Sequence, residues 1–174
     1  DKEPKTDIAL YFGFLKNADK NEFAVQKAVE LGVSRIGLFA SDYSSAYLSE
    51  NKTERLKKVA REAAKQCLRA SCPEIMAFSS FDEALKNSER YGVRLFACEF
   101  AKSSDDPIEK LLSGGAADGV AVMIGSEGGF SEREADEARK SGCSFVSLGR
   151  RILRAETAAV ALLSVAAYET GELK

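Results

Sequence analysis

The sequence predicts an α/β fold with a mainly parallel six-stranded sheet and helices on both of its faces. Strand-like apolar runs alternate with segments of helical periodicity along all 174 residues. Runs such as 8–15 are apolar and aromatic throughout, as in strands that are covered on both faces. A content of 45% hydrophobic and 30% charged residues is typical of a soluble globular protein, and no repeat or linker divides the chain into several domains.

In the first half of the chain, we expect strands at 8–15, 35–40 and 74–78 and helices at 22–31, 53–68 and about 80–87. The first helical pattern closes at Gly32. The second has apolar residues at Leu56, Val59 and Ala60, which is the i, i+3, i+4 spacing of an amphipathic helix, and it stops before Pro73. The polar segment 41–51 is predicted to be a loop.

In the second half, we expect strands at 94–100, 120–124 and 145–148 and helices at 107–112, about 131–142 and 156–169. Pro107 suits the first turn of a short helix. Ser131 and Glu134 form a capping-box pattern, in which each side chain satisfies a backbone amide at the helix start. The last helix ends at Gly171, and the polar segment 102–106 is predicted to be a loop.

The composition excludes several kinds of catalytic centre. The four cysteines form no C-x-x-C pair and the chain has no histidine, so we expect no metal site and interpret the cysteines as free thiols. Without histidine, Ser-His-Asp and Cys-His catalysis are excluded. A net charge of -2 means that nucleic acid would have to bind a local basic patch. The apolar runs are too short to span a membrane, so a cytoplasmic protein is expected.

Two loops at strand ends are the best candidates for a binding site. The glycine-rich turn 124–130 and the arginine-rich segment 148–158 each follow a predicted strand and lead into a helix. In an open α/β sheet this carboxyl edge is where ligands bind. The glycine spacing matches neither a dinucleotide fingerprint nor a P-loop, so nicotinamide cofactors and nucleoside triphosphates are disfavoured. Taken alone, the glycine turn could equally be a tight strand-to-helix connection.

The arginine-rich segment makes a ligand site the better interpretation. Leu148, Ile152 and Leu153 are apolar residues in a loop, where polar residues are usual, so they could cover a flat ring. Arg154 could face an anionic or electron-rich partner.

Four segments in order resemble one family. Residues 123–158 are similar to the pattern G-P-E-G-G-[FL]-[ST]-x-x-E followed by L-G-x-R-I-L-R-x-E-T-A, with Ser126 in place of the proline. Upstream, 26–33 resembles Q-K-x-x-E-L-G-V, and 62–69 resembles E-A-x-x-Q-x-x-R with Pro73 following. These are motifs of the bacterial 16S ribosomal RNA uridine-N3 methyltransferases, the RsmE type of the SPOUT superfamily.

The resemblance implies a deep C-terminal trefoil knot that gathers three loops around S-adenosylmethionine. It implies cofactor contacts at Phe96, Ala97, Cys98, Ile124, Gly125, Gly128, Gly129, Leu148, Gly149, Ile152 and Leu153. The loss of proline at Ser126 is expected to loosen the glycine turn without removing its amides.

The implied reaction is attack of a uracil N3 on the methyl group of the cofactor. Arg154 is the first choice for stabilising negative charge on the base. Glu127 is expected to accept the N3 proton or orient the base, and anchoring the turn is the alternative. Glu156 is expected to stabilise the start of the last helix. Gln66 and Arg69 share one helix face and are predicted to contact RNA, although an ordinary surface position is the alternative for Arg69.

The resemblance also implies partners. Family members act on 16S ribosomal RNA or the small ribosomal subunit and generally form homodimers through the knot. They usually carry an N-terminal PUA-like barrel, which we expect to be absent from these 174 residues, since the first strand begins almost at once. Ribose 2′-O methylation of RNA and a non-catalytic RNA-binding module remain alternative functions.

Overall fold

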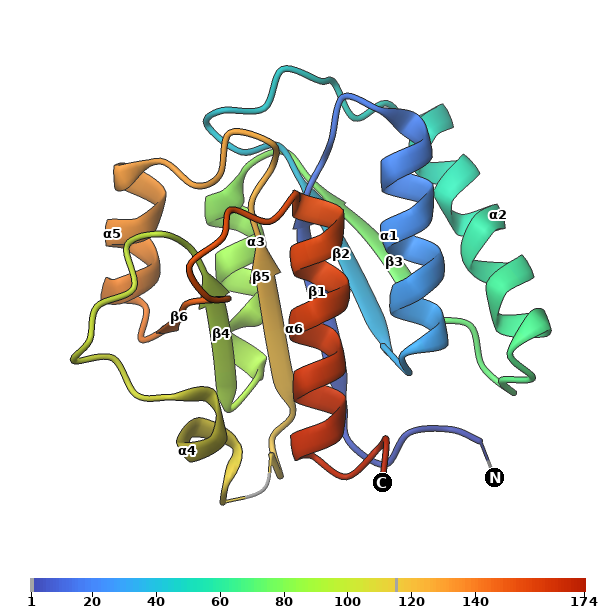
Figure 1. Cartoon of the computed structure of the whole chain (residues 1–174). Helices are drawn as coiled ribbons and strands as arrows, with labels where there is room; N and C mark the ends of the chain where they lie inside the picture. Colours follow the sequence, from blue (N-terminus) through green and yellow to red (C-terminus); the bar gives the residue numbers. More distant parts are fainter. Residues whose placement is uncertain (1, 115) are drawn as a thin grey trace.

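Six parallel strands form one sheet in the computed structural model, which describes residues 2–114 and 116–174 (Figure 1). The strands are β1 (Ile8–Gly13), β2 (Arg35–Phe39), β3 (Glu74–Phe78), β4 (Val93–Ala97), β5 (Val120–Ile124) and β6 (Ser144–Val146). Their order across the sheet is β3-β2-β1-β5-β4-β6, and every neighbouring pair is parallel. The prediction of a six-stranded parallel α/β sheet is confirmed.

Helices cover both faces of the sheet. They are α1 (Ala18–Glu30), α2 (Glu50–Gln66), α3 (Phe81–Asn87), α4 (Ile108–Leu112), α5 (Glu132–Lys140) and α6 (Ala155–Glu169), with a short 3₁₀ turn, η1 (Ser88–Arg90). In Figure 1, α1 and α6 lie in front of the sheet, α3 lies behind it, and both chain termini lie at the amino edge of the strands. No helix in the described part of the chain is long and apolar enough to cross a bilayer.

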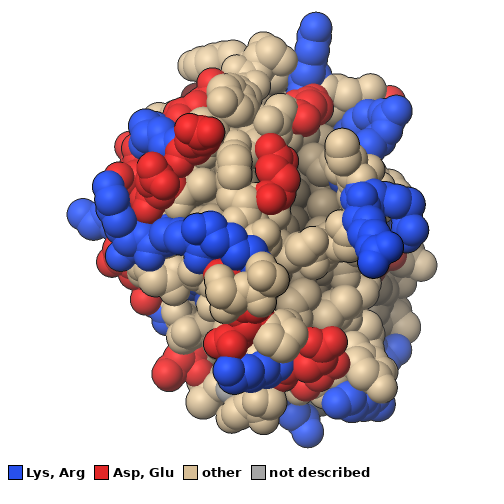
Figure 2. All heavy atoms as spheres, turned by 60° about the vertical axis from the view of Figure 1, so that its left-hand side comes forward, with Lys and Arg blue, Asp and Glu red and all other residues tan. Residues whose placement is uncertain are grey.

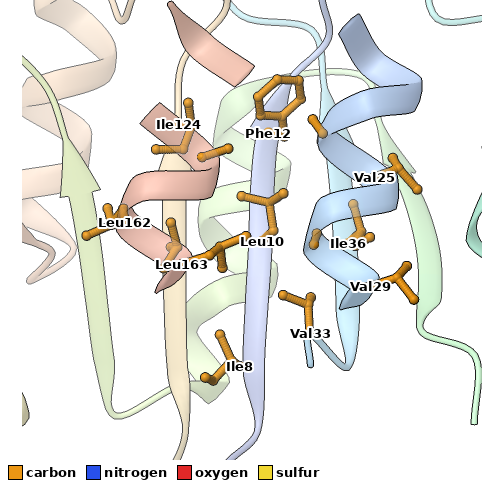
Figure 3. Close-up of a cluster of buried hydrophobic side chains, with 14 of the residues drawn as sticks. Ile8, Leu10, Phe12, Val25, Val29, Val33, Ile36, Ile124, Leu162 and Leu163 are labelled. Atoms are coloured by element: carbon orange, nitrogen blue, oxygen red, sulfur yellow. The ribbon is translucent and has the colours of Figure 1, made fainter. Parts of the chain in front are cut away.

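Alternating side chains of the central strands divide the core in two. Ile8, Leu10 and Phe12 of β1 belong to one cluster with α1 and α6, whereas Ala9 and Tyr11 belong to the other. Figure 3 shows the first cluster, in which Leu162 and Leu163 of α6 pack on β1 and β5. The second cluster is largely aromatic and lies under α3 and α5. Burial on both faces explains why these strands are apolar throughout.

The element types were predicted correctly, and several boundaries were wrong. Helix α1 begins four residues earlier than expected, because the Asn17 side chain caps it by accepting the Asp19 N–H at 2.9 Å. Helix α2 begins three residues earlier, because Ser49 caps it. The capping box of Ser131 and Glu134 is confirmed. Strands β1, β4 and β6 end before the apolar run ends, and the released residues enter the loops at the carboxyl edge.

Candidate functional site

Three loops at the carboxyl edge of the sheet enclose one pocket of about 670 Å³. The loop after β4 contributes Ala97, Cys98 and Glu99, and the loop after β5 contributes residues 124–130. The third wall is the segment 147–154 between β6 and α6, together with the first turns of α6. Residues as far apart in the sequence as Lys20 and Ala158 therefore line one pocket, and the glycine-rich and arginine-rich loops meet as the sequence predicted.

The glycine turn after β5 is closely packed against itself. Gly129 has a φ of +70°, and its N–H donates to the Ser126 carbonyl at 2.9 Å. A Cβ atom on Gly125 would lie 2.8 Å from the carbonyl carbon of Gly129, so this position tolerates no side chain. In the described part of the chain, no hydrogen bond uses the backbone N–H groups of Glu127 and Gly128.

Ser126 joins the turn to a neighbouring loop, and the expectation that serine loosens the turn relative to proline stays a prediction. Its side chain is buried, and its Oγ lies 2.8 Å from Oγ of Ser41 in the loop after β2. Ser41 Oγ in turn lies 3.0 Å from Ser44 Oγ. These serines replace the rigidity of a proline ring with hydrogen bonds to a neighbouring loop. The sequence gives no signal for this contact, because Ser41 and Ser126 are 85 residues apart.

Glu127 connects two loops. Its Oε1 accepts the backbone N–H of Lys16, in the connection from β1 to α1, at 2.8 Å. No described residue donates to Oε2. The anchoring role that was the alternative for Glu127 therefore has a structural basis, although the amide that it accepts belongs to another loop.

The arginine-rich segment begins with a turn and ends at an uncapped helix. Gly149 has a φ of +97°, and its N–H donates to Ser147 Oγ at 3.3 Å. Leu148 and Leu153 are half-buried, and Leu148 packs against the core. No side chain caps α6, and within the described residues the N–H groups of 150–153 have no hydrogen-bond acceptor. These free donors border the pocket, where a polar ligand can use them.

Arg154 precedes α6 and lines the pocket. Its side chain is exposed, and no described residue forms an ion pair with it. Ile152 lies in the same loop, but its side chain is fully exposed to solvent, at 102% of the reference area. Ile152 is nevertheless among the residues that line the pocket, so its expected contact with the cofactor stays a prediction.

Phe96 is placed differently from the prediction. Its side chain is fully buried, its ring centroid lies 4.1 Å from that of Phe130, and it is not among the residues that line the pocket. It supports the pocket floor from below, whereas the neighbouring Ala97 and Cys98 form the wall. Burial raises the pKa of the Cys98 thiol to about 11, so the thiol is protonated at neutral pH and is a poor nucleophile.

Two charged residues of the pocket wall come from different helices. Lys20 of α1 approaches Glu156 of α6, with 3.6 Å between Nζ and Oε1. Glu156 lies in the first turn of α6, where a carboxylate is stabilised by the helix dipole, as predicted. Sequence reasoning missed Lys20, because it lies in a polar first turn that resembles a loop.

Gln66 and Arg69 lie far from this pocket. Helix α2 starts at the carboxyl edge and runs back, so its end lies at the amino edge. The Arg69 side chain is 5% exposed, and its guanidinium donates to the carbonyls of Val29 and Val33 and to Glu3. Gln66 is exposed and lines a separate groove between α1 and α2. The structure therefore gives Arg69 a structural environment, and it does not bring either residue to the candidate site.

Charge on the surface is mixed. Figure 2 shows separate groups of lysine and arginine with acidic side chains between them on the face that it presents. Among the described residues, no three histidine, cysteine or acidic side chains are grouped closely enough to hold a metal ion. The site is thus a partly apolar pocket with free amide donors and a few cations at its rim.

Comparison with known proteins identifies the family. The model of the RNA methyltransferase domain matches residues 2–167. The chain is 36% identical over 169 residues to the ribosomal RNA small subunit methyltransferase E of Mesomycoplasma hyopneumoniae, covering 93% of this chain and 70% of that protein. The chain belongs to this family of RNA methyltransferases. This confirms the RsmE resemblance.

Other members of the methyltransferase E family agree with this assignment. The Bacillus subtilis member is 31% identical over 169 residues, covering 92% of this chain and 65% of that protein. The crystal structure of the Neisseria gonorrhoeae member bound to S-adenosyl methionine has a TM-score of 0.85 at 26% identity, covering 99% of this chain and 70% of that one. This chain thus spans about two thirds of the length of these relatives.

Proposed function

We propose that this chain transfers a methyl group from S-adenosylmethionine to N3 of a uridine in 16S ribosomal RNA, near the decoding region. The observation that carries the proposal is the convergence of three loops on one pocket, two of which contain the motifs of the methyltransferase E family. The Neisseria gonorrhoeae member, which has the same fold, was crystallised with this methyl donor. Because small-subunit RNA is made and assembled in the cytoplasm, we place the activity there.

The pocket fits the proposed cofactor in size and lining. Its volume of about 670 Å³ is within the range of small-molecule sites. The free N–H groups of Glu127, Gly128 and 150–153 can donate to a carboxylate and to ring nitrogens. Leu148 and Leu153 supply apolar surface. We assign cofactor binding to Ala97, Cys98, Ile124, Gly125, Gly128, Gly129, Leu148, Gly149 and Leu153 and to the backbone of Ile152.

S-adenosylmethionine, when bound, supplies an electrophilic methyl group, so the protein has mainly to align the base and favour its N3 anion. Arg154 has no described partner, and its fork of donors can therefore hold the carbonyl oxygens of uracil. Glu127 is held by the Lys16 amide through Oε1, which leaves Oε2 to orient the base or accept its N3 proton.

The trefoil knot belongs to the proposal as well. Strand β6 is the edge strand beyond β4, yet the chain returns to place α6 on β5 and β1. Helix α6 also packs against α4, which lies in the connection between β4 and β5. We infer that the returning segment threads through this connection. A crystal structure traced through both segments tests the threading.

We also propose a homodimer. Helix α6 has one main apolar face, formed by Leu162, Leu163 and neighbouring alanines. This face is buried inside the subunit and accounts for most of the apolar character of the helix. Val165 and Tyr168 remain 38% and 54% exposed on the same helix and are available to a second copy. Light scattering is expected to show a dimer that Val165→Asp converts to a monomer, and a monomeric wild type would contradict this part.

Calorimetry and a methylation assay test the function. We expect the chain to bind S-adenosylmethionine and to methylate unmodified small ribosomal subunits, and nucleoside mass spectrometry should detect 3-methyluridine. A 2′-O-methylated product would indicate the alternative RNA methyltransferase activity. Absence of cofactor binding would refute methyl transfer and favour a non-catalytic RNA-binding module.

A further inference from the structure

Ile152 is a large aliphatic side chain displayed in full contact with solvent. Its exposed fraction of 102% exceeds that of every other large hydrophobic side chain exposed in the described structure. Its neighbour Leu153 and the preceding Leu148 are half-buried, so the loop turns Ile152 outward while it turns the two leucines inward. Single exposed apolar side chains are common on protein surfaces, so the informative observation is that this one lies in the lining of the pocket.

The loop that displays Ile152 is fastened at both ends. At the start, Ser147 Oγ accepts the Gly149 N–H, and Leu148 packs against the core. At the end, the Arg154 carbonyl accepts the Ala158 N–H at 2.8 Å as α6 begins. Fastening at both ends keeps the position of Ile152 at the mouth of the pocket.

The charges around Ile152 indicate what kind of partner covers it. Arg150, Arg151 and Arg154 are all exposed, and none of them forms an ion pair with a described residue. An apolar tip surrounded by three free cations is complementary to a polyanion that also offers apolar surface, and RNA has phosphates and base faces. A second copy joined through this patch by a two-fold axis would instead place arginines opposite arginines.

The proposed reaction requires a protein contact of this kind, because the target base has to leave the RNA stack. N3 lies on the Watson–Crick edge of uracil, so the base must leave its stack before N3 can reach the methyl donor. Apolar side chains that enter the gap between neighbouring bases stabilise this kind of unstacked state. Ile152 lines the pocket that we propose for the donor, so it lies close to the place where an extruded uridine must be held.

We infer that Ile152 is an RNA-positioning residue, which inserts against the bases beside the target uridine while Arg150 and Arg151 contact the adjacent phosphates. This inference rests on the proposed function for the identity of the target. It reassigns the Ile152 side chain from the cofactor to the RNA.

The test compares Ile152→Ala with Leu173→Ala, which removes a similar exposed aliphatic side chain close to the C-terminus, at the opposite edge of the sheet. We expect Ile152→Ala to lower kcat/KM for unmodified small subunits about tenfold, the size of one lost apolar contact. The Kd for S-adenosylmethionine and the dimer mass should not change. Leu173→Ala should match the wild type in all three measurements.

A second measurement needs no methyl transfer. A small-subunit RNA hairpin carrying 2-aminopurine beside the target uridine should gain fluorescence when the wild type unstacks it, and this gain should be lost with Ile152→Ala. The inference is overturned if the variant weakens cofactor binding, dissociates a dimer, or leaves both RNA measurements unchanged. It is also overturned if the wild type binds the hairpin without a fluorescence gain. A wild type that produces this gain but transfers no methyl group refutes the proposed function alone.

Discussion

At the amino edge of the sheet, Arg69 is 5% exposed and its guanidinium donates to two carbonyls and to Glu3, whereas at the carboxyl edge Arg154 is exposed and has no described ion-pair partner. The same contrast extends to the backbone. The N–H groups of Lys5 and Thr6 donate to Glu172 at the amino edge, while those of 150–153 at the other edge have no acceptor in the described structure. Arg69 still has one buried donor without an acceptor among the described residues, its Nε, but its other guanidinium nitrogens are paired and stabilise the fold, whereas the donors at the carboxyl edge face the pocket.

Removing Arg154 should have the largest effect on activity. We expect Arg154→Ala to lower the rate of methyl transfer about 100-fold or more, as when one preorganised donor is removed from a site of developing charge. The melting temperature should stay close to the wild-type value, because no described residue forms an ion pair with Arg154. Rate measurements and thermal melts check both statements.

Arg154→Lys is the matched control. It keeps the charge but loses the planar fork, so we expect it to recover part of the rate. If Arg154→Ala melted well below the wild type, or transferred methyl groups as fast, the assignment to the reacting base would be wrong.

Removing Arg69 should have the opposite effect, lowering stability while leaving activity unchanged. Arg69→Met keeps an apolar stem but removes the donor to the Val33 carbonyl and the ion pair with Glu3, so we expect a loss of about 2 kcal/mol in the free energy of unfolding. For a chain of this size, that corresponds to a melting temperature lowered by roughly 4–8 °C. Urea unfolding and melts measure it, and kcat well below the transition should be unchanged.

Arg61→Met, on the exposed face of α2, is the control and should leave stability almost unchanged, whereas Arg69 lies beyond the end of this helix. If Arg69→Met instead weakened RNA binding at constant stability, the RNA contact predicted from the sequence for Arg69 would be supported after all.

Arg69 and Arg154 also show which structural features could be predicted from the sequence and which could not. Apolar runs predicted the six strands, because both faces of the central strands are buried, and apolar periodicity and helix-end signals predicted the six α-helices but not η1. Motif order predicted which loops meet, because the carboxyl ends of parallel strands share one edge. A motif cannot tell whether an arginine points into a pocket or into a set of carbonyls, since that depends on residues 36 to 40 positions away.

The predicted cofactor contact of the Phe96 side chain failed for the same kind of reason. Phe96 and Ala97 are consecutive residues at the end of β4, and the alternation of side chains sends Phe96 into the aromatic cluster and leaves Ala97 at the pocket wall. Ile152 and Leu153 are adjacent apolar residues, and the structure exposes Ile152 fully while it half-buries Leu153. Local sequence identifies the loop, and the three-dimensional contacts decide the role of each side chain.

A smaller effect is expected where the glycine turn touches the loop after β2. A Cβ atom on Gly128 would lie 2.8 Å from Cβ of Tyr43, so Gly128→Ala must displace one loop. We expect the Kd for S-adenosylmethionine to rise about tenfold, which is equivalent to about 1.4 kcal/mol of binding free energy. Calorimetry measures it.

Two variants sharpen this prediction. Gly114→Ala, where an added Cβ would meet nothing within 4 Å, should leave cofactor binding unchanged. Adding Tyr43→Gly to Gly128→Ala removes the clashing atom and should restore part of the affinity. If Gly128→Ala bound S-adenosylmethionine as tightly as the wild type, one of the two loops would be able to move without weakening cofactor binding.

The smallest effect concerns the stability of the loop after β4 at acidic pH. Hydrogen bonds from Arg139 at 2.8 and 2.9 Å hold the pKa of Asp105 at about 2, below its value of about 3.9 in an unfolded chain. A carboxyl group whose pKa is lowered by folding stabilises the protein above its unfolded pKa, and this contribution is lost as the pH falls from about 4 to about 2. Because Arg139 is 38% exposed, solvent screening should leave about 1 kcal/mol. Asp105→Asn should therefore lower stability at pH 6 by that amount and unfold with a shallower dependence on pH below 4. Parallel pH profiles of the variant and the wild type in urea unfolding would show that this ion pair does not stabilise the loop.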